Sequence, residues 1–276
     1  MRKLVVGSAI AAAMLSGCQT VDTTKAGVVG VDRDQRMMVS SEEVNAGSAK
    51  AYAQMMAEAK KKGVLDKDPD TLKRVREVTG RLIPHTRVFR PDAVKWPWEV
   101  HVISIEEVNA WCMPHGKMAI YTGLINKLNA TDDEIAAVMG HEIAHALREH
   151  SRERLSRQMA TQLGVGVIGA LFGIGELGQG IAGQVAEVTL NLPNSRLHET
   201  ESDRIGVELA ARAGYDPRAA VRLWEKMGKL GGGQPPKWLS THPPHEERIK
   251  DLKEYAAKVM PLYAKAKGKD SAAAGR

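Results

Sequence analysis

The stretch GHEIAHALREH, residues 140–150, carries three histidines and two glutamates in a run otherwise rich in alanine and isoleucine. It follows TDDE at 131–134, where a threonine hydroxyl and a glutamate carboxylate can each accept a hydrogen bond from an amide at a helix start. Apolar residues recur at helical spacing between 135 and 147. We therefore predict one helix that starts after Thr131 and carries GHEIAHALREH in its interior.

Four residues apart on this helix, His141 and His145 project from the same face, so both imidazoles can bind one metal ion. Glu142 lies beside them. In the H-E-x-x-H pattern, this glutamate acts as a general base toward a water molecule at the metal. A solvated polar helix face can match the same pattern by chance, so the interpretation requires a third ligand elsewhere in the chain.

Two known positions for the third ligand are excluded. One pattern requires a glycine and a histidine where this chain has Arg148 and Ser151. Another uses a glutamate about one helix later, but residues 155–175 contain neither Asp nor Glu. The ligand must therefore come from farther along the chain.

The segment NSRLHETESDRIG, residues 194–206, offers that ligand. Glu199 and Asp203 are four residues apart on a predicted helix, so one can bind the metal while the other orients a ligand histidine. Glu201 is the rival ligand. We prefer Glu199 because only it has an acidic partner four residues later. A solvated acidic helix start is the alternative interpretation of the segment.

Four segments together resemble family M48 of zinc metallopeptidases, which includes periplasmic lipoprotein proteases and the Ste24, HtpX and Oma1 peptidases. They are NAWCMPHGKMAIYTGLI, DEIAAVMGHEIAHALREH, SRLHETESDRIG and THPPHEERI, within residues 108–252. The resemblance implies an α+β, mostly helical, gluzincin-like domain with a small β-sheet beside the HExxH helix. It also implies one Zn²⁺ per chain, with protein or peptide substrates. The implied zinc ligands are His141, His145 and Glu199, with Glu142 as the base and Asp203 orienting a ligand histidine.

Two further histidines are judged against the same family. His242, in THPPHEERI, matches a histidine that either occupies the open zinc position at rest or stabilises the oxyanion during turnover. His115 stands where relatives often have the first glycine of a Gly-Gly pair, which questions the conformation of that turn. We interpret His115 as a loop histidine, with an extra metal ligand as the alternative.

The first twenty residues, MRKLVVGSAIAAAMLSGCQT, have a basic start, a short apolar run and small residues, as a secretory signal peptide does. The ending LSGC resembles the lipobox of bacterial lipoproteins, with Cys18 as the lipidated residue. A cleaved signal with an incidental cysteine is the alternative. Because Gln19 follows instead of the Asp that retains lipoproteins at the inner membrane, we expect the periplasmic face of the outer membrane. Lipidation of Cys18 would leave Cys112 without a disulfide partner.

The remaining sequence suggests four regions: a signal peptide (1–17), a lipidated polar tether (18–40), the peptidase domain (41–265) and a flexible basic tail (266–276). Helices are expected at 42–62 and 70–82. A strand is expected at 98–105, and a second strand that runs into a helix or turn at 117–125, with a turn-rich connection between them. We expect the strand near 119–121 to present an edge to which an extended substrate adds.

The apolar interval 158–186 begins with an 18-residue uncharged run and contains eight glycines between 164 and 183. We favour a packed or lid-like insertion over the active site, because glycine weakens helices and suits a moving loop. A surface that dips into the membrane and a true membrane span are the alternatives.

The formal net charge of +6 is mild and evenly spread, which argues against nucleic acid as a partner. The sequence therefore predicts a zinc endopeptidase of the bacterial envelope, anchored to the membrane through Cys18, that hydrolyses misfolded or stalled proteins. The alternative is an outer-membrane assembly or chaperone-like factor, associated with the assembly machinery, whose protease activity is residual or latched by His242.

Overall fold

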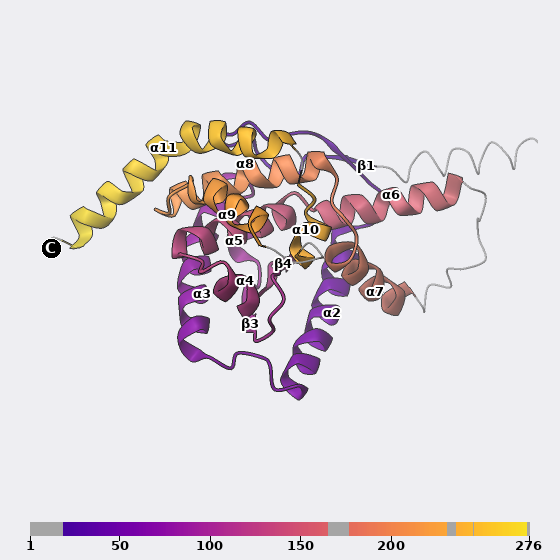
Figure 1. The fold of residues 1–276 in the computed structure, drawn as a ribbon. Helices are drawn as coiled ribbons and strands as arrows, with labels where there is room; N and C mark the ends of the chain where they lie inside the picture. The colour runs from indigo at the N-terminus through magenta and orange to yellow at the C-terminus, as the bar shows by residue number, and fades with distance from the viewer. Residues whose placement is uncertain (1–18, 165–176, 231–235, 245, 275–276) are drawn as a thin grey trace, which may run out of the picture.

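The computed structural model describes residues 19–164, 177–230, 236–244 and 246–274 (Figure 1). Its strands are β1 (Gln19–Val21), β2 (Gln35–Met37), β3 (Glu99–Ile103), β4 (Ala110–Met113) and β5 (Lys117–Tyr121). Its α-helices are α2 (Ser41–Lys61), α3 (Pro69–Leu82), α4 (Thr122–Lys127), α5 (Asp132–Leu147), α6 (His150–Gly164), α7 (Leu177–Leu190), α8 (Arg196–Arg212), α9 (Ala219–Gly228), α10 (Lys237–Thr241) and α11 (Glu246–Ala274). Two 3-10 helices are η1 (Ile83–Val88) and η2 (Ala93–Lys95). The expected mostly helical α+β fold is confirmed.

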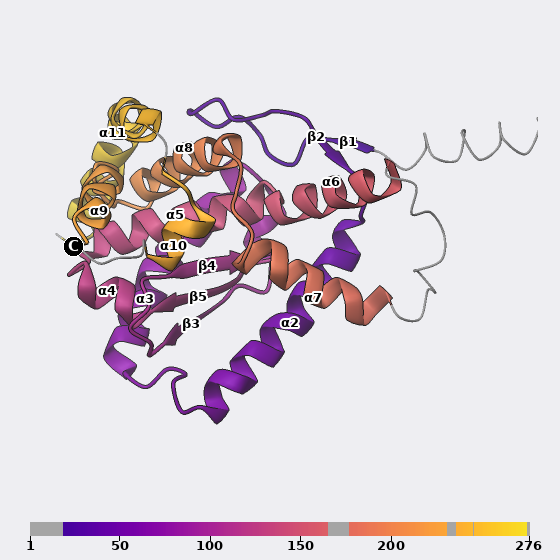
Figure 2. The same ribbon diagram turned by 45° about the vertical axis from the view of Figure 1, so that its right-hand side comes forward.

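Helix α5 lies between α8 and the three-stranded sheet, and α11 runs along the outer side of α8 (Figure 2). The Thr131 hydroxyl accepts a hydrogen bond from the Glu134 amide, and the Glu134 carboxylate accepts one from the Thr131 amide, as the TDDE sequence predicts. All residues of α5 from Glu134 to Leu147 are buried. The part of α5 that carries His141, Glu142 and His145 is therefore surrounded by the rest of the protein.

Two glycines bring α5 and α8 into backbone contact. A Cβ atom at Gly206 would lie 2.8 Å from the His141 amide nitrogen, and one at Gly140 would lie 3.0 Å from the Gly206 carbonyl oxygen. Any side chain at Gly206 would force the helices apart, because the nearest atoms are backbone. This close approach carries the acidic residues of α8 toward the histidines of α5.

The three-stranded sheet has the order β3-β5-β4, with β5 parallel to β3 and antiparallel to β4. Two predictions fail here. The connection predicted to be turn-rich contains the strand β4, and β5 is the central strand instead of the edge offered to substrate. In the described part of the chain, β4 is the edge strand nearest α5.

The turn between β4 and β5 keeps a left-handed backbone at both central positions, with φ of 65° at His115 and 81° at Gly116. The His115 ring lies edge-on to Trp96, with ring centroids 5.4 Å apart. A Cβ atom at Gly116 would lie 2.6 Å from Trp98. His115 is therefore accommodated in the turn at the cost of backbone strain, and the second glycine is required by packing.

Residues 19–40 lie against the folded body, contrary to the tether predicted for 18–40. We call residues 19–40 the N-terminal arm; it begins in β1, returns through β2 and passes beside α6 and α8 (Figure 2). Val29 and Val31 belong to the main hydrophobic core, and Gln35 is fully buried. The arm is therefore part of the domain in this structure.

The ends of the apolar interval 158–186 lie in α6 and α7, and its middle, 165–176, lies outside the described residues. In α7, Ile181 and Val185 are buried and pack with α2, where a Cβ atom at Gly47 would lie 2.8 Å from Ile181. Among the described residues, no helix has the length and apolar character needed to cross a membrane. At the other end of the chain, α11 extends to Ala274, through most of the tail predicted to be flexible.

Candidate metal centre

Four side chains from three parts of the chain converge beneath α8. They are His141 and His145 of α5, Glu199 of α8 and His242, which caps α10. One ligand atom from each lies within 4.8 Å of the other three, and all four residues are buried. The i, i+4 spacing in α5 supplies two of these donors and the first turn of α8 supplies the third.

The separations between these atoms are short and similar. The Nε2 atoms of His141 and His145 are 3.0 Å apart, and the His242 Nδ1 atom lies 3.1 Å from the His141 Nε2 atom. The Glu199 Oε1 atom lies 3.3 Å from the Nε2 atom of His145 and 3.1 Å from the Nδ1 atom of His242. Three imidazole nitrogens and a carboxylate oxygen facing one point form a donor set suited to a metal ion.

Asp203, four residues after Glu199, orients the first histidine. Its Oδ1 atom lies 2.9 Å from the His141 Nδ1 atom, so that nitrogen carries the proton and Nε2 presents its lone pair to the cluster. Burial alone would raise the pKa of Asp203, but Arg248 and His141 outweigh it and hold the pKa below its usual value. The carboxylate is therefore charged.

Arg248 of α11 neutralises both carboxylates beneath the cluster. Its Nε and Nη2 atoms donate to Asp203 at 2.5 Å and 2.9 Å, and its Nη1 atom lies 2.6 Å from the Glu199 Oε2 atom. Burial also raises the pKa of Glu199, but His242 and Arg248 lower it by more. The pKa of Glu199 therefore lies well below its usual value. Arg248 was missed from the sequence, because it lies in THPPHEERI but binds carboxylates on α8, more than 40 positions earlier.

Glu142 lies beside the cluster and its carboxylate is held in place. The Trp238 indole N–H donates to its Oε1 atom at 2.8 Å, and the His242 Nε2 atom lies 3.4 Å from the same oxygen. The Trp238 ring also stacks on the His242 ring, with centroids 4.8 Å apart and planes 23° apart. Trp238 was missed from the sequence, where a single tryptophan before a proline-rich loop gave no chemical signal.

The rival ligand Glu201 lies outside the cluster. Its carboxylate contacts Arg33, Arg148 and His150, on the side of α8 that faces the N-terminal arm. His115 contacts Trp96 and is not among the possible metal donors found in the described residues. The structure thus separates Glu199 from both alternatives.

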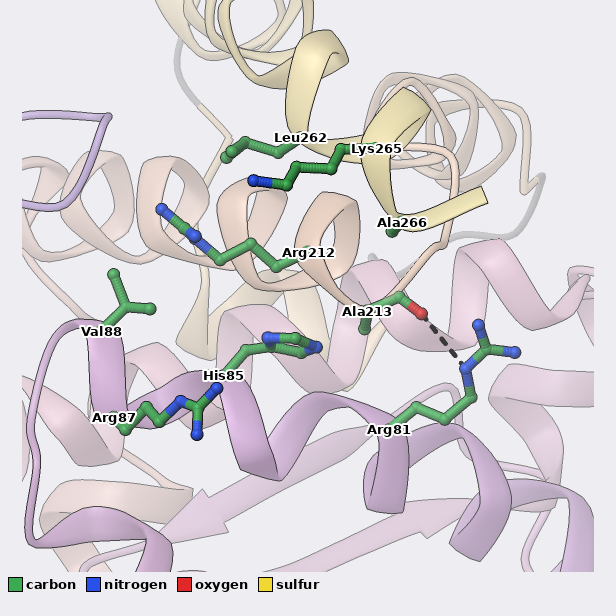
Figure 3. Close-up of a pocket in the computed structure, with 9 residues that line it drawn as sticks. All are labelled: Arg81, His85, Arg87, Val88, Arg212, Ala213, Leu262, Lys265 and Ala266. Atoms are coloured by element: carbon green, nitrogen blue, oxygen red, sulfur yellow. Dashed lines mark hydrogen bonds between the residues drawn. The ribbon is translucent and has the colours of Figure 1, made fainter. Parts of the chain in front are cut away.

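A hollow of about 410 Å³ lies between η1, the end of α8 and α11 (Figure 3). Arg81 donates to the Ala213 carbonyl oxygen at 3.1 Å, and Arg212 pairs with Glu208 at 2.7 Å. The remaining lining residues are His85, Arg87, Val88, Leu262, Lys265 and Ala266. Because Glu199 lies at the opposite end of α8, this hollow is separate from the metal cluster.

Comparison with known proteins agrees with this geometry. The chain is 40% identical over 163 residues to mitochondrial metalloendopeptidase OMA1 of Arabidopsis thaliana, covering 59% of this chain and 32% of the relative. It is 32% identical over 241 residues to human metalloendopeptidase OMA1, covering 83% and 44%. It is 27% identical over 259 residues to metalloprotease YcaL of Escherichia coli K12, covering 92% and 97%.

The chain thus spans less than half the length of these mitochondrial relatives and nearly all of the bacterial one. Residues 69–256 match peptidase family M48. This match covers more than half of the chain and confirms the family resemblance seen in the sequence. The chain belongs to peptidase family M48.

Proposed function

We propose that the chain is a zinc-dependent endopeptidase of the bacterial cell envelope. The observation that carries the proposal is the convergence of His141, His145 and Glu199 on one point, with Glu142 directly beside it. Relatives named metalloendopeptidase and metalloprotease support the reaction class. Misfolded or stalled envelope proteins are the proposed substrates.

The donor set and its spacing fit zinc. Nitrogen and oxygen ligands lie about 2.0–2.2 Å from zinc, and in a tetrahedral site such ligands are roughly 3.3–3.6 Å from one another. The separations of 3.0–3.3 Å between the nitrogens of His141 and His145 and the Glu199 oxygen are close to that range. Neutral imidazoles and one carboxylate also make a donor set typical of zinc peptidases.

In this proposal the chain's own residues supply orientation and proton transfer. A bound zinc ion would polarise a water molecule and the scissile carbonyl. The Glu142 carboxylate accepts the proton of that water and later donates it to the leaving amine. Because the Trp238 N–H is bonded to the Oε1 atom, Glu142 keeps one orientation and its Oε2 atom is left for the proton. Asp203 and Arg248 keep His141 and Glu199 fixed during these steps.

The sheet edge suited to an extended substrate is β4. The Tyr121 amide donates to the Asn109 carbonyl, so in the antiparallel pair the main-chain groups of Ala110 and Cys112 point away from β5. The Trp238 amide donates to the Val108 carbonyl at the start of this edge. A peptide added to β4 would therefore run beside the residue that holds Glu142, and its main chain would provide most of the recognition.

His242 is expected to restrain the resting enzyme. Its Nδ1 atom lies 3.1 Å from both the His141 Nε2 atom and the Glu199 Oε1 atom, so with a metal ion bound His242 would occupy the position that a water or substrate needs. We expect His242→Ala to raise cleavage of protein substrates and self-cleavage, measured with purified protein. If the residue instead stabilises the oxyanion, kcat should fall by about 10² to 10³. Wild-type rates on both peptides and proteins would exclude either role.

The proposed location in the cell envelope rests on the predicted signal peptide and on Cys18, which lie outside the described residues. We expect Cys18→Ala to abolish labelling by a radioactive fatty acid and to release the protein from membrane fractions, provided that export still occurs. Cys112→Ala is the matched control: because Cys112 is buried, its replacement should leave the labelling and the membrane attachment unchanged. Membrane attachment that persists in Cys18→Ala would point to another anchor and contradict the lipobox.

The second candidate function is an outer-membrane assembly or chaperone-like factor with latched protease activity. It is favoured by one observation: all four donors are buried, and His242 is among them. A comparison of all envelope proteins between cells with wild-type protein and cells with Glu142→Gln separates the two functions. A protease leaves specific proteins or fragments changed in the variant, whereas an assembly factor leaves the two proteomes alike.

A further inference from the structure

His145 is oriented by a chain of buried groups instead of by a direct carboxylate. Its Nε2 atom faces the metal cluster, so its Nδ1 atom carries the proton and donates to the His150 Nδ1 atom at 2.8 Å. The His150 Nε2–H then donates to the Glu201 Oε2 atom at 3.0 Å. Glu201 therefore fixes the tautomer of His150, and His150 fixes the ring of His145, as Asp203 does directly for His141.

Glu201 can serve as the final acceptor only if its charge is balanced, because its side chain is just 6% exposed. Arg33 provides the main balance: its Nε atom donates to Oε1 at 2.8 Å and its Nη2 atom to Oε2 at 3.2 Å. Arg148 adds a longer contact of 3.4 Å to Oε1. A two-point arginine contact also holds the carboxylate plane in a fixed orientation.

Arg33 belongs to the N-terminal arm, and the arm is bonded to the body around it. The fully buried Arg148 donates to the Arg33 carbonyl at 2.8 Å and to the Thr24 hydroxyl at 3.0 Å. Gln35 donates to the Arg148 carbonyl at 2.8 Å. Arg33 also donates to Glu153 at 3.0 Å and 3.1 Å. The guanidinium is therefore placed by the arm and cannot easily be replaced by a solvent ion.

We propose that Arg33 is a positioning residue for the metal ligand His145, acting through Glu201 and His150. The inference rests on the proposed metal site and deepens it, because it makes the N-terminal arm, which begins directly after Cys18, part of the support of the cluster. Without Arg33, Glu201 keeps one longer contact to Arg148 and loses its fixed plane. His150 can then change orientation, and the His145 ring is no longer held toward the metal.

The matched control is on the same arm. Arg36 is exposed and lies three residues after Arg33, in β2, so Arg36→Ala removes the same charge without touching Glu201. In the purified full chain, zinc affinity is measured by competition with a chromogenic chelator, and the site is also loaded with Co²⁺ to record its visible spectrum. Melting temperatures of the metal-free proteins report on folding separately.

We expect Arg33→Ala to weaken zinc binding about 10-fold to 100-fold and to alter the Co²⁺ spectrum, as the loss of an outer partner of a metal ligand does. Arg36→Ala should match the wild type, and Arg33→Lys should recover part of the affinity, since it restores the charge without the two-point contact. An unchanged affinity and spectrum in Arg33→Ala would overturn the inference, even if its metal-free melting temperature falls. A wild-type chain that binds no zinc would overturn the metal site itself.

Discussion

Glu199→Ala is expected to empty the metal site, whereas Glu201→Ala should weaken it and leave metal bound. Glu199 presents its Oε1 atom 3.3 Å from His145 and 3.1 Å from His242, so its loss removes the only acidic donor of the cluster. It also leaves the Nη1 atom of the buried Arg248 without its carboxylate partner, which reduces the charge balance of Arg248 to its contact with Asp203. Metal content after dialysis, measured by atomic emission, should fall from about one ion per chain to a small fraction.

The comparison with Glu201→Ala makes this test specific. Glu201 is equally acidic and only two residues away, but it contacts His150 and Arg33 instead of the cluster. Its loss should cost the roughly 10-fold to 100-fold in affinity typical of an outer partner, with the metal ligands themselves still in place. If Glu201→Ala empties the site and Glu199→Ala retains metal, the ligand assignment is reversed.

The part of the site that the sequence predicts is the part set by local geometry. His141 and His145 lie on one helix face because of their spacing, and the same rule pairs Glu199 with Asp203. The capping sequence at Thr131 locates the helix start, which in turn puts both histidines in the helix interior. These features depend on contacts within one turn or two, which residue order determines.

The features that the sequence did not predict depend on partners far along the chain. Strand β4 is buried at all four positions, so it lacks the alternation by which a half-buried strand is recognised. The central position of β5 follows from pairing on both sides, which its own residues do not reveal. The N-terminal arm is polar and aperiodic because it binds buried polar groups such as Arg148 and Glu201, and that composition equally suits a solvated tether.

Arg248 and Trp238 show the same limit at the site itself. Arg248 contacts Asp203, 45 positions earlier, and Trp238 contacts Glu142, 96 positions earlier. Neither residue is a metal donor, so metal-ligand spacing cannot identify them. They are recognised only when the C-terminal part of the chain is folded over α5 and α8, where one balances the buried carboxylates and the other aligns the base.

Glu142→Gln is expected to retain metal and to lose peptidase activity. Glutamine has the shape of glutamate, and its carbonyl oxygen can still accept the Trp238 hydrogen bond at 2.8 Å, so the surroundings of the cluster need not move. An amide cannot accept the proton of the attacking water at neutral pH. Loss of a positioned general base typically costs about 10² to 10⁴ in rate, and we expect kcat for a cleaved peptide to fall within that range.

Metal content distinguishes the loss of the general base from the loss of the metal ion. Zinc bound by Glu142→Gln should equal that of the wild type, because His141, His145 and Glu199 are unchanged. Loss of activity together with loss of zinc would mean that Glu142 supports the site instead of acting in the reaction. Activity near the wild-type rate, with zinc retained, would require another base. His242 could take that role, because its Nε2 atom lies 3.4 Å from the Glu142 Oε1 atom. Glu142→Gln combined with His242→Ala should then remove the remaining activity.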